Sequence, residues 1–265
     1  MKFSILTLSF NQAKFLEEAI RSIVDQDYPD IEYIVVDPGS TDGSREIIER
    51  YRDRIAKIIF EPDRGCADGL NKGFAAATGD VYGFINSDDV LMPGALTRVA
   101  DYFRAEPDAD IVMGHEWIID GEGRKVRKSY TDRFELRSYA YDGGVIAQQS
   151  TFFRAELYKK TAGFDATLAT NWDTELFLDM LLLSRKQLYV DDFLGGFRIH
   201  DECITTQSDF NDRRRAYQRA RFKRIMGRPW TTGDNLIWLY YRVRKYMLEP
   251  RALLERLRYG PITQG

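Results

Sequence analysis

Two adjacent carboxylates follow a short apolar segment of the chain. Residues 81–85 are rich in β-branched and aromatic side chains, and Asn86, Ser87, Asp88 and Asp89 follow them directly. This pattern is typical of a buried parallel strand that ends at the carboxyl edge of a sheet, where ligands of open α/β sheets bind. Because adjacent carboxylates repel each other, the segment predicts a divalent cation that also holds a phosphate, with a solvated Asp-Asp turn as the alternative.

Acidic residues also follow two other predicted strands. The segments 31–36 and 55–60 are apolar, and they are followed by Asp37 and by Asp63. Successive parallel strands end at the same edge of a sheet, so these acids and Asp88 should lie along one edge. The repetition favours a ligand site over a solvated turn.

The elements that position these acids alternate between strands and helices. Strands are predicted at 3–8, 31–36, 55–60, 81–86 and 110–114, and helices at 15–24, 44–54, 68–77, 93–105 and 175–183. Asn11 is expected to cap the first helix. The alternation predicts βαβ units, and therefore an α/β fold with a mostly parallel central sheet flanked by helices.

Size and composition indicate a globular protein. The chain has 265 residues, 44% of them apolar and 30% charged, which suits one large α/β domain with an appendage. It has no apolar run near the roughly 20 residues of a membrane span, and its first residues are strand-like rather than a signal peptide. Cys66 and Cys203 are too few for a disulfide framework. We therefore expect a cytoplasmic protein.

The charge is distributed unevenly along the chain. Residues 213–258 contain 14 Lys and Arg but 3 Asp and Glu, although the net charge of the whole chain is −3. We expect a catalytic domain at 1–210 and a basic helical extension at 211–265. Within the extension, one helical face is apolar and is formed by Leu236, Leu239, Tyr240, Val243 and Met247. That face suits the inner surface of an anionic plasma membrane, or packing on the catalytic domain or in self-association. No nucleic-acid module is visible.

Common nucleotide-binding motifs are absent from the sequence. No Gly-x-Gly-x-x-Gly follows a strand, and there is neither a Walker loop nor the Gly-rich, Arg-bearing opening loop expected of sugar-nucleotide pyrophosphorylases. A nucleotide would have to be held by carboxylates on its base or ribose and by a metal on its diphosphate.

The first 200 residues resemble the family 2 inverting glycosyltransferases, which have the GT-A-type nucleotide-sugar fold. The matching blocks are residues 7–11 (TLSFN), 36–44 (VDPGSTDGS), 61–65 (EPDRG), 71–73 (NKG), 77–80 (ATGD), 86–89 (NSDD), 163–165 (GFD), 172–176 (WDTEL) and 197–200 (FRIH). The resemblance implies a nucleotide-sugar site formed by Thr7, Ser9, Asp37, Asp63, Asn71, Asn86, Ser87, Asp88 and Arg198. In this site Asp37 would accept an N–H of the base, unless it is a turn or helix-capping carboxylate. Asn71 could equally bond to backbone within the protein.

The resemblance also implies a metal and a catalytic base. Mn²⁺ or Mg²⁺ would be bound by Asp88, Asp89 and His200, and would neutralise charge on the diphosphate leaving group. Asn86 stands where the family usually has an acid. Asp173 would be the base, unless it caps the helix that follows it.

The implied function is inverting transfer of a sugar, with a UDP-sugar favoured as donor, to a hydroxyl of a saccharide or lipid-linked acceptor in cell-surface polysaccharide synthesis. Two alternatives remain open. One is a sugar nucleotidyltransferase, and the other is a nucleotide-sugar-binding module with a degenerate site.

Overall fold

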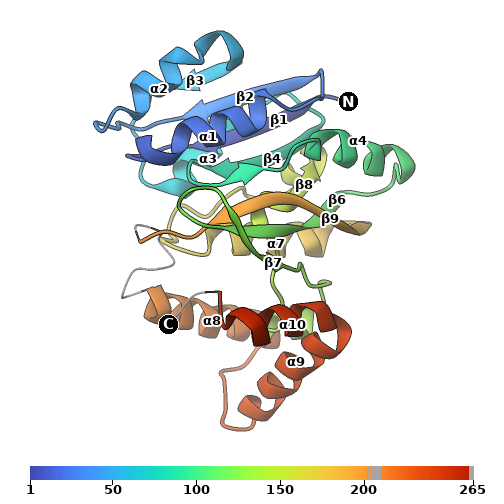
Figure 1. Ribbon diagram of the computed structural model, residues 1–265. Helices are drawn as coiled ribbons and strands as arrows, with labels where there is room; N and C mark the ends of the chain where they lie inside the picture. Colours follow the sequence, from blue (N-terminus) through green and yellow to red (C-terminus); the bar gives the residue numbers. More distant parts are fainter. Residues whose placement is uncertain (202, 204–209, 263–265) are drawn as a thin grey trace. The chain divides into compact units, whose positions relative to one another are not determined.

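A nine-stranded sheet with helices on both faces forms the centre of the computed structural model, which describes residues 1–201, 203 and 210–262 (Figure 1). Its strands are β1 (Phe3–Leu8), β2 (Ile31–Val36), β3 (Lys57–Ile59), β4 (Val81–Asn86), β5 (Val90–Leu91), β6 (Ile111–Ile119), β7 (Lys125–Ser129), β8 (Thr151–Arg154) and β9 (Gln187–Arg198). Its helices are α1 (Ala13–Val24), α2 (Ser44–Arg50), α3 (Cys66–Ala76), α4 (Ala95–Ala105), α5 (Leu136–Ala140), α6 (Ala155–Tyr158), α7 (Trp172–Leu183), α8 (Phe210–Met226), α9 (Asp234–Leu248) and α10 (Pro250–Tyr259).

The strand order is β3-β2-β1-β4-β8-β6-β9-β5, with β7 paired to β6. Strands β1 to β4 pair in parallel, whereas β4 with β8, β6 with β8 and β5 with β9 pair antiparallel. The predicted α/β fold class is confirmed, with a mixed sheet whose parallel half holds the three predicted acidic strand ends. Asp37, Asp63 and Asp88 follow β2, β3 and β4, all of which lie in that half.

Alternate side chains of the strands enter two different cores. On one face Phe3 and Ile5 of β1 pack with apolar residues of α1, α2 and α4. On the other face an aromatic cluster joins Phe74 of α3 to Tyr82, whose ring centroid lies 5.1 Å away, and to Phe84. Both faces of the strands are buried because successive side chains of a strand point to opposite faces of the sheet. Packing on both faces keeps the ends of these strands in place.

Gly73 lets α3 lie unusually close to the sheet. A Cβ atom on this residue would fall 1.8 Å from Cδ1 of Leu6 and 3.1 Å from Cγ2 of Val36. Since no side chain fits in that space, the glycine sets the distance between α3 and β1. The N-terminal end of α3 is thereby held beside the end of β1.

Some element boundaries differ from the prediction. Asn11 does not cap α1: the helix begins after Gln12, while Asn11 has a φ of 51° and its side-chain oxygen accepts from the N–H of Thr41. β6 is also longer than predicted, because the segment around Trp117 continues the strand predicted at 110–114.

The chain divides into two compact units. The first unit is Met1–Glu116 with Ala147–Arg198, and the second is Trp117–Ile146 with Ile199–Gly265. Within the second unit, Tyr141 packs on Phe222, Trp230 and Tyr241, and its hydroxyl donates to Asp234 over 2.7 Å. The predicted division at residue 210 adjoins positions 204–209, which lie outside the described residues, and stays a prediction.

Candidate active site

The turn between β4 and β5 is organised by a buried carboxylate. Asp89 is 1% exposed and accepts hydrogen bonds from the backbone N–H of Arg198 (2.9 Å), the amide of Gln149 (2.6 Å) and the amide of Asn86 (3.2 Å). Burial, and then the neighbouring charge of Asp88, raises the pKa of Asp89 well above its ordinary value. Asp89 therefore connects this turn to the end of β9.

Asp88 differs from its neighbour in exposure. Its side chain is half-buried, whereas Ser87 and Asp89 on either side are buried. Of the adjacent carboxylates, Asp88 is therefore the one that a ligand can approach.

Arg198 fixes the same turn from the end of β9. Its side chain is fully buried, and its guanidinium donates to the backbone oxygen of Asp88 (2.7 Å) and to the carboxylate of Glu18 on α1 (2.6 Å). The guanidinium also lies 5.1 Å from the ring centroid of Phe15. In this arrangement Arg198 positions the loop that carries Asp88, and its implied contact with a nucleotide sugar stays a prediction.

The ends of β1 and β2 are joined through Asp37. Its carboxylate is fully buried and accepts from the hydroxyls of Ser9 (3.1 Å) and Ser40 (2.6 Å), from the N–H of Ser40 (2.8 Å) and from Nε of Arg45 (3.0 Å). Burial raises the pKa of Asp37, but the hydrogen bonds outweigh it and the net shift is downward. The lowered pKa favours the charged form of Asp37, which organises the loop after β2 through these hydrogen bonds.

Thr7 is also buried, on β1 between β2 and β4. Its hydroxyl oxygen accepts from the hydroxyl of Tyr33 over 3.0 Å. Its predicted role in the base and ribose pocket remains untested.

Three of the predicted acids affect the pKa of the same thiol. Burial first, and then the charges of Asp63, Asp88 and Asp173, raises the pKa of the Cys66 thiol at the start of α3. The carboxylates of Asp63, Asp88 and Asp173 therefore lie within electrostatic reach of Cys66. Their membership of one catalytic site stays a prediction.

Asp173 lies in the first turn of α7. It is half-buried, its carboxylate accepts from the Thr174 hydroxyl over 3.4 Å, and the helix is capped at Asn171 without a side-chain hydrogen bond. Burial raises the pKa of Asp173, and the hydrogen bonds from Thr174 only partly oppose that shift. Asp173 is therefore not the capping residue, and its carboxylate is a stronger base than an exposed aspartate.

The side chain of Asn71 is engaged within the protein. Its amide donates to the backbone oxygen of Phe164 (2.8 Å), and its oxygen accepts from the N–H of Phe164 (2.9 Å) and from the hydroxyl of Tyr158 (3.2 Å). This matches the backbone-bonded alternative, in which Asn71 holds the loop before α7 against α3.

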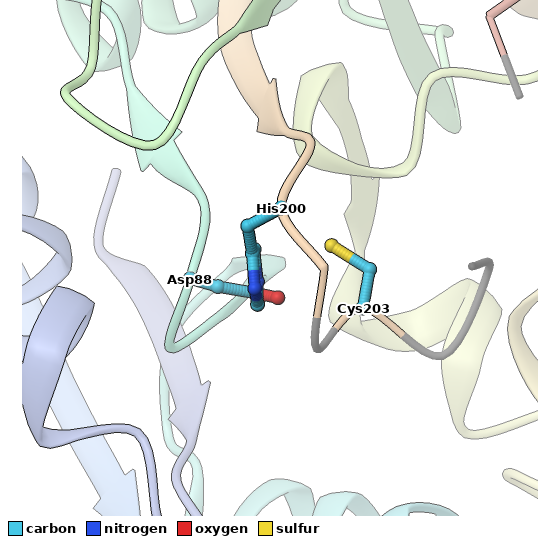
Figure 2. A group of neighbouring side chains, drawn as sticks. All are labelled: Asp88, His200 and Cys203. Atoms are coloured by element: carbon cyan, nitrogen blue, oxygen red, sulfur yellow. The ribbon is translucent and has the colours of Figure 1, made fainter. Parts of the chain in front are cut away.

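His200 and Cys203 follow β9 in the second unit, and the nearest donor atoms of the two side chains lie within 4.8 Å of each other. Figure 2 labels both side chains in the segment that follows β9. The predicted role of His200 as a metal ligand stays a prediction.

Sequence reasoning missed Gln149, Glu18 and Cys203. Gln149 contacts Asp89 and Glu18 contacts Arg198, in both cases across a long stretch of the chain, and neither Gln149 nor Glu18 lies in a recognisable motif. Cys203 could have been noticed, because it follows His200 by three residues, a spacing that allows both to face one ligand.

The order of this mixed sheet, with acids after its parallel strands, is that of a GT-A-type α/β domain. The chain belongs to glycosyl transferase family 2, whose model matches residues 4–161, more than half of its length.

Named relatives and solved structures agree with this family. An uncharacterised glycosyltransferase of Nostoc sp. is 41% identical over 135 residues, which are 49% of this chain and 41% of that protein. The putative teichuronic acid biosynthesis glycosyltransferase TuaG of Bacillus subtilis is 37% identical over 102 residues, 37% of this chain and 40% of TuaG. The chain thus spans about two fifths of the length of these relatives.

Two structures share the fold over 98% of this chain. S. aureus TarS in complex with UDP-GlcNAc has a TM-score of 0.66 at 19% identity, with 73% of that chain covered. The mannosyltransferase PcManGT of Pyrobaculum calidifontis, in complex with GDP-Man and Mn²⁺, has a TM-score of 0.64 at 17% identity, with 76% of that chain covered.

Proposed function

We propose that this protein transfers a sugar, with inversion, from a nucleoside-diphosphate donor to an acceptor hydroxyl. The observation that carries the proposal is that Asp37, Asp63 and Asp88 follow three parallel strands of one sheet, in a chain that belongs to glycosyl transferase family 2. We expect the candidate base, Asp173, to lie beside the donor that these acids hold.

The donor is a nucleotide sugar, and we favour a UDP-sugar. The fold is shared with proteins whose structures contain UDP-GlcNAc or GDP-Man, and Asp37, which follows β2 in the parallel half of the sheet, is expected to lie beside the base. Asp63, Asn86 and Ser87 are expected along the ribose and diphosphate.

A divalent cation fits the residues present. The half-buried Asp88 is adjacent to the buried carboxyl group of Asp89 and raises the pKa of that group, and a cation at Asp88 would oppose this effect. Carboxylate oxygens suit Mn²⁺ or Mg²⁺. We expect Asp88 and His200 to hold the cation, with Asp89 as a residue that positions Asp88. When bound, the cation would offset charge on the diphosphate leaving group.

Asp173 is the proposed base. As the acceptor oxygen forms a bond to the anomeric carbon and the bond to the diphosphate breaks, the acceptor proton passes to the Asp173 carboxylate. The burial that raises its pKa makes this carboxylate a better proton acceptor, although it must still be ionised before each turnover.

The acceptor is expected to be a saccharide or lipid-linked hydroxyl in cell-surface polysaccharide synthesis. The likeness to a protein named for teichuronic acid biosynthesis supports this setting. A sugar nucleotidyltransferase would instead release pyrophosphate from a nucleoside triphosphate, which distinguishes the two reactions.

The test is hydrolysis or transfer from a panel of nucleotide sugars with Mn²⁺. Asp173→Asn should lower the turnover by about 100- to 10,000-fold while nucleoside-diphosphate binding is kept. Asp179→Asn is the matched control, since Asp179 lies on the same helix and its pKa is also raised by burial. Full turnover in the Asp173 variant would show that another group is the base.

A further inference from the structure

Helix α9 presents an apolar face to solvent. It packs within the second unit through Tyr241, which stacks on Tyr141 at 5.6 Å, and through the buried Asp234. The opposite side carries five apolar residues that are 52–77% exposed: Leu236, Leu239, Tyr240, Val243 and Met247. These are the residues of the apolar face predicted from the sequence, and the structure leaves that face uncovered.

Helix α10 also exposes its apolar side chains and makes polar contacts with the rest of the second unit. It meets β7 and its surroundings through polar contacts: the carboxylate of Glu255 accepts from the N–H of Lys128 (2.9 Å), and the guanidinium of Arg251 lies 4.7 Å from the ring centroid of Tyr130. Its apolar residues are exposed instead, with Leu254 at 66% and Leu257 at 75%. A helix on the surface of a soluble protein normally turns its apolar side inward.

The two helices together expose more apolar surface than a surface helix pair normally does. Ten large apolar side chains on them are exposed: the seven named above together with Leu248, Leu253 and Tyr259. Patches of this kind mark sites where a protein meets a partner or a membrane. Among the described residues, no helix is both long and apolar enough to cross a bilayer, so a membrane contact here would be interfacial.

The charges around the apolar faces favour an anionic surface. Residues 234–259 contain six Lys and Arg but three acids. The three acids are engaged inside the unit: Asp234 by Arg228, Glu249 by Arg251, and Glu255 by the backbone of Lys128. Arg244 and Lys245 are likewise paired, with Glu135 and Asp132, so the cations that remain for an anionic surface are Arg242, Arg256 and Arg258. A second copy placed on this face by a twofold axis would bring the cationic surface against itself.

We propose that α9 and α10 form an interfacial membrane-binding surface for anionic phospholipids. Leu236, Val243, Met247, Leu254 and Leu257 enter the acyl boundary, while the Arg side chains flanking them meet lipid phosphates. Apolar side chains with arginines beside them are what lipid interfaces bind. The inference rests on the second unit alone and does not depend on the proposed transferase reaction.

The test is flotation of the 265-residue chain with phosphatidylcholine vesicles, with and without phosphatidylglycerol. The protein should bind the anionic vesicles, and Leu254→Ser with Leu257→Ser should weaken binding about tenfold or more, since each CH₂ withdrawn from lipid costs about 0.8 kcal/mol. Arg256→Gln with Arg258→Gln should weaken binding to anionic vesicles by about fivefold for each charge and leave binding to neutral vesicles unchanged.

The matched control is Leu182→Ser with Leu183→Ser, which removes two leucines of similar exposure from the end of α7 in the first unit. The substituted residues are exposed, apart from the half-buried Arg256, so the circular dichroism of the variants should match that of the wild type. Failure of the wild type to float, or equal loss in the control, would overturn the proposal. So would a wild-type dimer, seen by sedimentation, that the Leu254 and Leu257 changes dissociate without altering flotation.

Discussion

Arg198→Met tests whether this arginine stabilises the β4–β5 turn or serves mainly as a ligand for the donor. The wild-type guanidinium is fully buried, and it bonds the Asp88 backbone oxygen at 2.7 Å and the Glu18 carboxylate at 2.6 Å. Methionine keeps much of the apolar stem but supplies no donor. The variant therefore leaves the Asp88 oxygen without its charged partner.

The expected cost follows from the exposure of each partner. A hydrogen bond from a charged group to the Asp88 oxygen contributes about 1.5–3 kcal/mol. Glu18 is 52% exposed, so water can replace its partner and the ion pair adds at most about 1 kcal/mol. We expect Arg198→Met to lower the free energy of unfolding by about 2–4 kcal/mol.

Urea denaturation followed by circular dichroism measures this change, with Glu18→Gln as the control that removes only the exposed partner. Glu18→Gln should cost less than about 1 kcal/mol. If Arg198→Met unfolds like the wild type but no longer binds a nucleoside diphosphate, the arginine is a ligand for the donor and our account of the turn is wrong.

Two further predictions concern stability. Glu32 is buried, and although burial raises its pKa, hydrogen bonds from Ser4 and other donors lower the pKa from 4.5 to about 2. The ionised Glu32 should therefore contribute about 3 kcal/mol to the free energy of unfolding above pH 4.5, and this contribution should be lost as the pH falls toward 2. Glu32→Gln should remove that pH dependence in acid denaturation. Gly73→Ala should destabilise by about 1–3 kcal/mol in thermal unfolding because of its clash with Leu6, whereas Gly121→Ala, which meets no atom within 4 Å, should leave the melting temperature unchanged.

The sequence predicted the parallel half of the fold well. β1 and β2 have the predicted bounds, because both are short, mainly apolar runs rich in β-branched and aromatic residues, and polar residues follow them. The acids Asp37, Asp63 and Asp88 also follow neighbouring parallel strands as expected. Local patterns suffice here, since they fix which residues end each strand.

The sequence could not predict the contacts that organise the site. Gln149 and Arg198 reach Asp89 across 60 and 109 positions of the chain, and such pairings depend on how β8 and β9 lie in the sheet. The exposure of the apolar face of α9 was likewise undetermined, because helical periodicity shows that a face is apolar but not what covers it.

Calorimetric titration of UDP and GDP in the presence of Mn²⁺ tests the central claim most directly. We predict saturable, Mn²⁺-dependent binding of one of these nucleotides by the wild type, and its loss in Asp88→Asn, whose half-buried side chain keeps its size but not its charge. No binding of either nucleotide by the wild type, or equal binding by the wild type and Asp88→Asn, would contradict a nucleotide-sugar site at this edge of the sheet.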